Sequence, residues 1–135
     1  MYIFDSSVCI EFLRGKLPNV QKMIEKSDPS LFAIPAIVEA ELLVGAEKSS
    51  CPVKNRQLVE RFISAFQVLP FDSVCARTYA QVRASLEAAG NPIGPLDQLI
   101  AATALAHYSP LVTNNDREFS RVPGLQVEVW EEIEW

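Results

Sequence analysis

Acidic or amide side chains stand at four places in this sequence where an alternating α/β chain would direct them to one edge of its sheet. Asp5 directly follows the apolar run at residues 2–4, which is typical of a short buried strand. Asn115 and Asp116 follow a second such run, at residues 111–113. Because parallel strands end at the same edge of a sheet, these side chains are expected to be neighbours.

Glu41 is a third candidate, in a predicted helix. At about 100° per residue, Glu41 shares a face with apolar residues, whereas Glu39 points almost the opposite way. The residues on the face of Glu41 are Ile34, Ile37, Val38, Val44 and Gly45. An unpaired carboxylate buried there would cost several kcal/mol, roughly, so Glu41 is expected to be protonated, salt-bridged or bound to a cation.

Asp97 is the fourth candidate and stands two residues after Pro95, in the first turn of another predicted helix. Backbone N–H groups and the helix macrodipole favour a negative charge at that position. The residues predicted to share its face are Ile100, Ala101, Ala104 and Tyr108.

Each of these side chains also has a purely structural interpretation. A carboxylate or hydroxyl at the start of a helix often serves only as a cap, and a core acid often pairs with an arginine. In the structural alternatives, Asp5 or Ser6 caps the first helix, Asp97 complements a helix dipole, and Asp116 caps the turn at 117–119. Glu41 would form a salt bridge with Arg77 or Arg83. The functional interpretation rests on the fact that acidic or amide side chains at all four places are expected at the same edge of the sheet.

Carboxylates at close range repel one another, and a hard divalent cation with oxygen ligands relieves the repulsion. Mg²⁺ or Mn²⁺ suits an all-oxygen set without cysteine or histidine. Such sites carry out phosphoryl chemistry, in which one ion activates a water and a second, about 3.5–4 Å away, stabilises the leaving oxygen. The single histidine, His107, lies near the far end of the helix from Asp97 and is interpreted as structural or surface.

The segments that carry these residues alternate between strands and helices, which predicts an α/β fold with a mostly parallel sheet covered on both faces. We expect strands at residues 2–4, 31–34, 67–69, 111–113 and 126–129. Helices are expected at residues 7–13, 19–26, 35–48, 52–66, 72–89 and 95–107, with Pro35 as a first helical residue. The length of 135 residues predicts one domain over residues 1–135.

Composition narrows the class of protein. No apolar run approaches the roughly 20 residues of a membrane-spanning helix, and the start lacks a signal-peptide profile, so a cytoplasmic protein is expected. Three scattered cysteines predict neither a disulfide framework nor a zinc site. The net charge of -5 argues against a broad basic face but not against a nuclease, because bound cations supply local positive charge. The acidic tail, residues 131–135, is expected to be solvated.

At these residues the chain resembles the PIN-domain ribonucleases, and more narrowly the VapC toxins of type II toxin–antitoxin pairs. The matching stretches are residues 4–7 (FDSS), 37–49 (IVEAELLVGAEKS), 94–102 (GPLDQLIAA), 112–119 (VTNNDREF) and 122–125 (VPGL), with Trp130. Together they extend from end to end of the chain, and the combination is highly specific.

The resemblance implies a three-layer α/β/α fold with a five-stranded, mainly parallel sheet, and Mg²⁺-dependent hydrolysis of RNA by a metal-activated water. Mn²⁺ is a possible substitute. It implies metal ligation by Asp5, Glu41 and Asp97, with Ser6 in support. The family's fourth position, often aspartate, falls on Asn115, and the adjacent Asp116 is an alternative. Candidate contacts to RNA phosphates are Arg14, Lys48 and Arg117, with plain surface charge as the alternative interpretation.

The implied partners are an RNA substrate, a VapB-like antitoxin that docks a helix and a basic segment into the acidic groove, and a second copy in a homodimer. Two other functions stay open. One is a small doubly wound phosphatase or phosphoacceptor with Asp5 as nucleophile, which lacks a second acid two residues later and a glycine-rich phosphate loop. The other is a catalytically silent PIN-like binding module, which the amide at Asn115 suggests.

Overall fold

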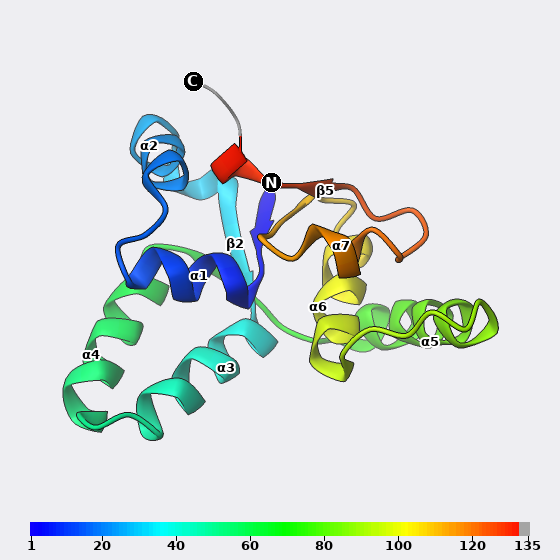
Figure 1. The fold of residues 1–135 in the computed structure, drawn as a ribbon, viewed down its shortest axis with the longest axis horizontal. Coiled ribbons are helices and arrows are strands. Elements are labelled where there is room, and N and C mark those ends of the chain that lie inside the picture. The colour runs from blue at the N-terminus through cyan, green and yellow to red at the C-terminus, as the bar shows by residue number, and fades with distance from the viewer. Residues whose placement is uncertain (133–135) are drawn as a thin grey trace.

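Five short strands form one parallel sheet in a computed structural model, which describes residues 1–132 (Figure 1). The strands are β1 (Tyr2–Phe4), β2 (Phe32–Pro35), β3 (Gln67–Leu69), β4 (Leu111–Val112) and β5 (Val127–Glu128). Their order across the sheet is β3-β2-β1-β4-β5. The chain thus moves outward from β1 to β3 and then returns to the other side of β1. The order reverses between β1 and β4, where open α/β folds bind their ligands.

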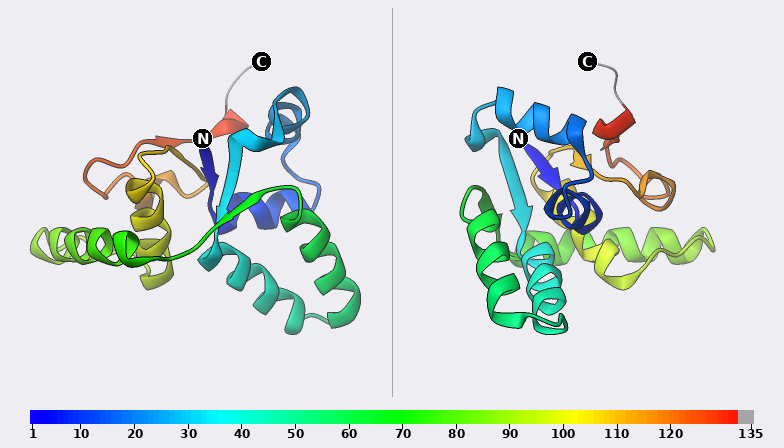
Figure 2. Two further views of the ribbon diagram at one scale, coloured as in Figure 1. Left: turned by 180° about the vertical axis from the view of Figure 1, so that it is seen from behind. Right: turned by 60° about the vertical axis from the view of Figure 1, so that its left-hand side comes forward.

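Helices flank this sheet, as the sequence predicts. They are α1 (Ser6–Leu13), α2 (Pro18–Lys26), α3 (Ala36–Glu47), α4 (Pro52–Ile63), α5 (Ser73–Ala88), α6 (Pro95–Ala106) and α7 (Asp116–Phe119), with 3₁₀ turns η1 (Pro29–Leu31) and η2 (Trp130–Glu132). Figure 1 shows α1 to α4 on one side of β1 and β2, with α5 and α6 on the other. In Figure 2, α5 extends away from the sheet and packs against α6. Among residues 1–132, no helix has the length and apolar character needed to cross a membrane.

Most element boundaries lie within a residue or two of the predictions, and three differences have a physical cause. Leu31 ends the η1 turn, so β2 begins one residue later than predicted. Pro35 ends β2 and is the N-cap of α3, with extended φ and ψ of -60° and 146°, because its fixed φ suits either position. Helix α4 ends at Ile63, since a tight turn, with the Phe66 N–H donating to the Ile63 carbonyl at 2.9 Å, redirects the chain into β3.

Aromatic side chains in the core connect the end of the chain to the central strands. Phe4 of β1 stacks on Phe32 of β2 with ring centroids 5.4 Å apart, and Trp130 meets Phe4 edge-on at 5.5 Å. All three side chains are buried, and each buried aromatic ring stabilises the fold by about 1.5–3 kcal/mol. Trp130 therefore fixes η2 against the strand that ends at Asp5.

Glu131, in the acidic tail, is not simply solvated as predicted. Its carboxylate accepts hydrogen bonds from the backbone N–H groups of Asn19 at 3.1 Å and Val20 at 3.2 Å, in the first turn of α2. The N-cap residue of that helix, Leu17, makes no side-chain capping bond. Glu131 therefore caps α2 from a distant part of the sequence. Glu132 is exposed, and the rest of the predicted tail, 133–135, lies outside the described residues.

Replacing Glu131 with alanine is expected to lower the free energy of unfolding by about 1 kcal/mol, because the first turn of α2 loses its anionic cap. The matched control is Glu132→Ala at the exposed neighbour, for which we expect a change within about 0.5 kcal/mol. Urea unfolding at pH 7 measures both variants. Equal stability of the two would contradict the capping role.

Candidate active site

Asp5 lies where the strand order of the sheet reverses. It follows β1, and Thr113 follows β4, whose Val112 is paired in register with Phe4. The backbone N–H of Asp5 donates to the Val112 carbonyl at 3.1 Å, which extends the ladder to the end of both strands. The Asp5 side chain is only 2% exposed. The predicted meeting of these two strand ends is confirmed.

Both oxygens of the Asp5 carboxylate accept hydrogen bonds. The Val8 N–H donates to Oδ1 at 2.9 Å, the Ser7 hydroxyl lies 2.8 and 2.9 Å from the two oxygens, and the Thr113 hydroxyl donates to Oδ2. Asp5 is therefore the N-cap of α1, as its structural interpretation predicts. Burial raises the pKa of Asp5, these hydrogen bonds oppose the rise, and the charge of Glu41 adds to it. Capping and membership of an acidic site coexist in one residue.

Glu41 reaches the same edge of the sheet from the second turn of α3. Ser6, the first residue of α1, donates a hydrogen bond from Oγ to Glu41 Oε1 at 2.7 Å. The alternative pairing with an arginine is not formed: Arg83 pairs with Glu87, and within residues 1–132 Arg77 forms no salt bridge with Glu41. A serine hydroxyl, rather than a cationic side chain, therefore joins Glu41 to the start of α1.

The predicted burial of the face that carries Glu41 is correct for Ile34 and Val38 but wrong for Val44 and Gly45. Helix α3 buries Val38, Leu42 and Ala46, whereas Val44 is 50% exposed and Gly45 lies at the surface. The helix is apolar around most of its circumference, so periodicity alone does not identify the face that packs on the core. Glu41 lies at the rim of the buried face and remains partly hydrated.

Asp97 lies in the first turn of α6, as predicted. Three of the residues predicted on its face are fully buried, namely Ile100, Ala101 and Ala104. Tyr108 departs from that face and is 98% exposed, because its positive φ of 50° turns the chain after the helix. His107 is the C-cap at the opposite end of α6 from Asp97, in agreement with its structural interpretation.

The pKa of Asp97 shows that four acids interact at this edge. Burial raises the pKa to about 7, together with a hydrogen bond to Glu118 and the negative charges of Glu118, Asp5 and Glu41. Within residues 1–132 none of the four carboxylates has a lysine or arginine partner. The salt bridges there belong to other acids: Glu11, Glu47 and Glu87. The site is thus a concentration of negative charge without a compensating cationic side chain.

Glu118 belongs to this cluster, although the sequence reasoning missed it. Its Oε2 accepts a hydrogen bond from Asn115 Nδ2 at 3.1 Å, and its carboxyl group meets Asp97. Asn115 is the N-cap of α7, so Asp116 is not the predicted cap but an exposed first helical residue. One signal could have found Glu118: in a helical turn, residues three apart share a face, and Glu118 follows Asn115 by three. Metal ligation by Asn115 or Asp116 stays a prediction.

The donor set fits a hard divalent cation, because it offers carboxylate, hydroxyl and amide oxygens without sulfur or imidazole. Within residues 1–132, no three acidic, histidine or cysteine side chains yet stand in an arrangement that holds a metal ion. Hydrogen bonds explain this: Asp5 is turned toward Ser7 and Thr113, and Glu41 toward Ser6. A cation would compete with these hydroxyl donors for the carboxylate oxygens.

Of the three basic candidates, Arg117 precedes Glu118 in α7 and is exposed, and Arg14 lines the same groove as Glu41. Arg14 follows the far end of α1, roughly 13 Å along the helix axis from its start. It pairs there with Glu11 at 3.1 Å. Lys48 follows the far end of α3 and is also exposed. Contact of these side chains with RNA stays a prediction.

An open groove of about 370 Å³ between α1, α3 and α4 adjoins the acids through Glu41, which forms part of its lining. Most of the other lining residues are apolar, and they include Ile10, Leu13, Leu42, Gly45, Leu58 and Val59. The groove and the acidic site are therefore continuous.

Comparison with known proteins agrees with this geometry. Residues 2–125 match the PIN domain family. The chain is 39% identical over 129 residues to the tRNA(fMet)-specific endonuclease VapC of Salmonella typhimurium, covering 96% of this chain and 97% of the relative. It is 35% identical over 135 residues to ribonuclease VapC2 of Rickettsia felis, covering 97% and 98%. The fold matches the DNA-bound VapBC structure from Salmonella typhimurium with a TM-score of 0.91, 38% identity and coverage of 96% and 97%.

Replacing Asp97 with asparagine is expected to stabilise the metal-free protein above pH 7. Asp97 titrates near pH 4 in the unfolded chain but near pH 7 in the fold, so its contribution to stability is full below pH 4 and is lost as the pH rises to about 7. After allowance for solvent screening, Asp97→Asn should raise the free energy of unfolding by about 1 kcal/mol at pH 7.5.

Urea unfolding in EDTA between pH 4 and 8 measures this effect, and the difference between variant and wild type should grow across that range. The matched control is Asp116→Asn at the exposed neighbour of the site, which we expect to change stability little. An Asp97→Asn variant that is less stable than wild type at pH 7.5 would contradict repulsion among the four acids.

Proposed function

We propose that this chain, which belongs to the PIN-domain family and within it to the VapC ribonucleases, is a Mg²⁺-dependent endoribonuclease toxin held inactive by an antitoxin. The observation that carries the proposal is the convergence of four carboxylates, without a cationic partner, where the strand order reverses. That arrangement costs stability in the free protein and is useful when a divalent cation neutralises it.

Three acids are proposed to hold the cation: Asp5, Glu41 and Asp97. Ser6 supports them, because its hydroxyl fixes Glu41. When bound, Mg²⁺ would supply the Lewis acidity that activates a water for attack on an RNA phosphate. Glu118 is the best-placed fourth acid, since it already meets Asp97, and Asn115 holds its carboxylate in place.

The geometry disfavours a phosphoacceptor with Asp5 as nucleophile. A nucleophilic carboxylate must present an oxygen to the substrate. Asp5 is 2% exposed, and both of its oxygens accept hydrogen bonds from residues of α1 and from Thr113. Its environment suits a fixed ligand better than an attacking group.

We infer that the substrate is a folded RNA and that initiator tRNA is the first one to test. The relative from Salmonella typhimurium, 39% identical over nearly the whole chain, is named a tRNA(fMet)-specific endonuclease. Arg117, exposed next to Glu118, is proposed to contact a phosphate close to the cleaved bond. Because tRNA acts in the cytoplasm, a cytoplasmic location is part of the same proposal.

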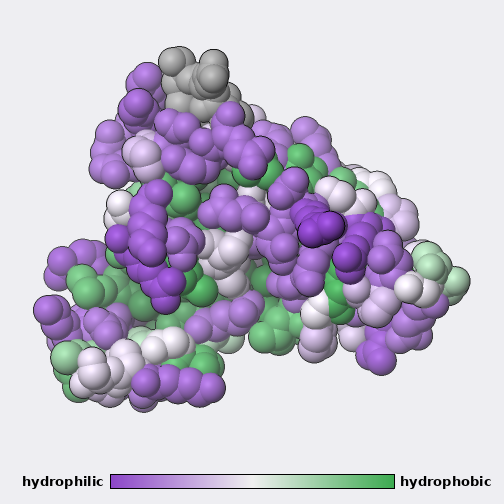
Figure 3. Space-filling view, in the orientation of Figure 1, coloured by the Kyte–Doolittle hydropathy of each residue, from purple (hydrophilic) through white to green (hydrophobic). Residues whose placement is uncertain are grey.

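The open groove supports a helical antitoxin segment as the inhibitor. Three exposed apolar side chains lie in or beside it, with 38% exposure for Leu13, 50% for Val44 and 45% for Leu58. Figure 3 shows apolar surface among polar residues over this part of the molecule. A Cβ atom at Gly45 would meet nothing within 4 Å, so a partner's backbone has room to approach α3. The structural relative from Salmonella typhimurium is a VapBC complex, and a homodimer of the toxin is part of the same proposal.

Purified protein is expected to cleave initiator tRNA in Mg²⁺, leaving a 5′-phosphate and a 3′-hydroxyl, and EDTA should abolish the reaction. Asp5→Asn and Asp97→Asn should each lower the cleavage rate at least about 100-fold, because the cation loses a ligand and the site loses charge stabilisation. Denaturing gels measure the rate. In thermal unfolding, Mg²⁺ at 100 times its Kd should add about 2.7 kcal/mol to wild type.

The control for this experiment is His107→Gln, at the far end of α6, which should cleave like wild type. Glu118→Gln should slow cleavage more than Asp116→Asn if Glu118 is the fourth acid. Cleavage that survives EDTA, or that is unchanged in Asp5→Asn and Asp97→Asn, would sink the proposed function.

Gly45→Leu is expected to release the enzyme from its antitoxin without impairing cleavage. The leucine side chain would project into the open groove, and leucine has the higher helix propensity, so the fold should persist. Affinity for a VapB-like antitoxin that inhibits the wild-type enzyme should fall at least about 10-fold, an estimate based on interface substitutions that disturb a packed core. Calorimetry and cleavage in the presence of antitoxin measure the two effects.

The matched control is Ala40→Leu, at an exposed position on α3 outside the groove. Equal antitoxin affinities of the two variants would refute the docking site.

A further inference from the structure

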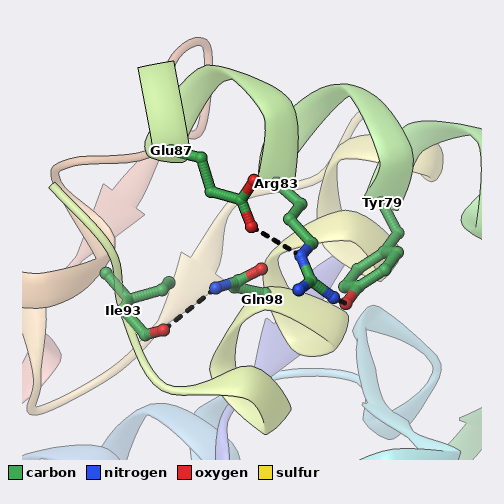
Figure 4. A network of polar contacts seen from close by, with 5 residues as sticks. All are labelled: Tyr79, Arg83, Glu87, Ile93 and Gln98. Carbon is green, nitrogen blue, oxygen red and sulfur yellow. Dashed lines mark hydrogen bonds and ion pairs between the residues drawn. The ribbon is translucent and has the colours of Figure 1, made fainter. Parts of the chain in front are cut away.

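Gln98, the residue after Asp97, has an unusual environment. Its side chain is 8% exposed, and its Nε2 donates a hydrogen bond to the Ile93 carbonyl at 3.0 Å (Figure 4). Its Oε1 is the single buried side-chain nitrogen or oxygen within residues 1–132 that has no hydrogen-bond partner. A buried amide with one oxygen unsatisfied costs stability, so packing alone does not explain a glutamine at this position.

The orientation of this amide follows from its neighbours. Exchanging the amide nitrogen and oxygen would set Oε1 against the Ile93 carbonyl, with two acceptors facing each other. On α5, the nearby Arg83 donates to Glu87 at 2.8 Å and to Tyr79 at 3.1 Å (Figure 4). Gln98 therefore keeps the hydrogen bond from Nε2 to the Ile93 carbonyl, although its Oε1 is left without a hydrogen-bond donor.

That bond fixes the segment that leads into α6. Ile93 precedes Gly94, the N-cap of the helix, and the backbone N–H of Gln98 donates to the Gly94 carbonyl at 3.0 Å. Gln98 thus holds two successive carbonyls, one through its side chain and one through its backbone. The N-cap, in turn, lies against the functional carboxylate, because a Cβ atom at Gly94 would be 3.4 Å from Asp97 Oδ2.

We propose that Gln98 is a positioning residue for Asp97: it fixes residues 93 and 94 so that the Asp97 carboxylate faces Glu118 and the divalent cation. The inference rests on the proposed function, because it assigns Gln98 to the same metal site. Gln98 does not touch the cation or the RNA and acts through the first turn of α6 alone. The unsatisfied Oε1 is the structural cost of holding that turn in place.

The test is Gln98→Met, which keeps the length and unbranched shape of the side chain but removes both the Nε2 donor and the unsatisfied oxygen. The control is Gln81→Met, at an exposed position on α5. The measurements are thermal unfolding without metal, Mg²⁺ affinity by calorimetry, kcat and KM on tRNA, and hydrogen exchange of the Gln98 backbone amide. Gln98→Leu provides a second variant if the methionine packs poorly.

We expect Gln98→Met to unfold at the temperature of wild type or above, and to bind Mg²⁺ about 10-fold more weakly, as for residues that support metal ligands. The value of kcat should fall, KM should stay near that of wild type, and exchange of the residue-98 amide should become faster. A lower unfolding temperature with unchanged Mg²⁺ affinity would overturn the proposal, since it would reveal a packing role only.

Failure of the proposed function gives a different result. If wild-type protein neither binds Mg²⁺ nor cleaves RNA, the exchange measurement alone decides the role of Gln98. Faster exchange of the residue-98 amide in Gln98→Met than in Gln81→Met then supports the positioning role, and equal exchange overturns it.

Discussion

Repulsion among four carboxylates is the constraint around which the rest of the structure is arranged. Asp5, Glu41, Asp97 and Glu118 meet without a lysine or arginine partner in the described residues. Backbone groups supply part of the missing positive potential. Asp5 is the N-cap of α1, and Asp97 lies in the first turn of α6, so both acids lie at positive ends of helix dipoles. This partial compensation lets the acids coexist while leaving the site able to gain from a cation.

The strands that aim these acids are only two to four residues long, so tertiary packing must hold them in register. Phe4, which immediately precedes Asp5, packs against Phe32 and Trp130, and those two rings also contact each other. Glu131, the neighbour of Trp130, then caps α2. The end of the chain therefore stabilises both the first strand and the second helix. The acid at the end of β1 is held by residues more than a hundred positions away.

The sequence predicted the positions of residues that depend on local signals, and it did not predict those that depend on packing between distant segments. Asp5 and Asp97 were predictable because a strand end and a proline-opened helix are local features. Glu118 was missed because α7 has only four residues, and its proximity to Asp97 depends on how that turn packs against α6. Tyr108 was misplaced because a single positive φ ends the helical pattern. The parallel direction of the strands was predictable from alternation, whereas their order across the sheet and their exact ends were not.

Helix α3 is apolar on more of its surface than the core of this chain buries. Apolar residues occur on every face of a helix that makes contacts, including a face that contacts a second molecule. Val38, Leu42 and Ala46 are buried, while Val44 and Gly45 lie at the surface, and Leu42, Gly45 and Ala46 all line the groove. Buried and exposed residues alike are apolar, so they appear in the sequence as one broad stripe. Glu41 lines the same groove and accepts a hydrogen bond from Ser6. A molecule that fills the groove would therefore contact a residue of the acidic site directly, and the proposed inhibition would require no conformational change transmitted through the core.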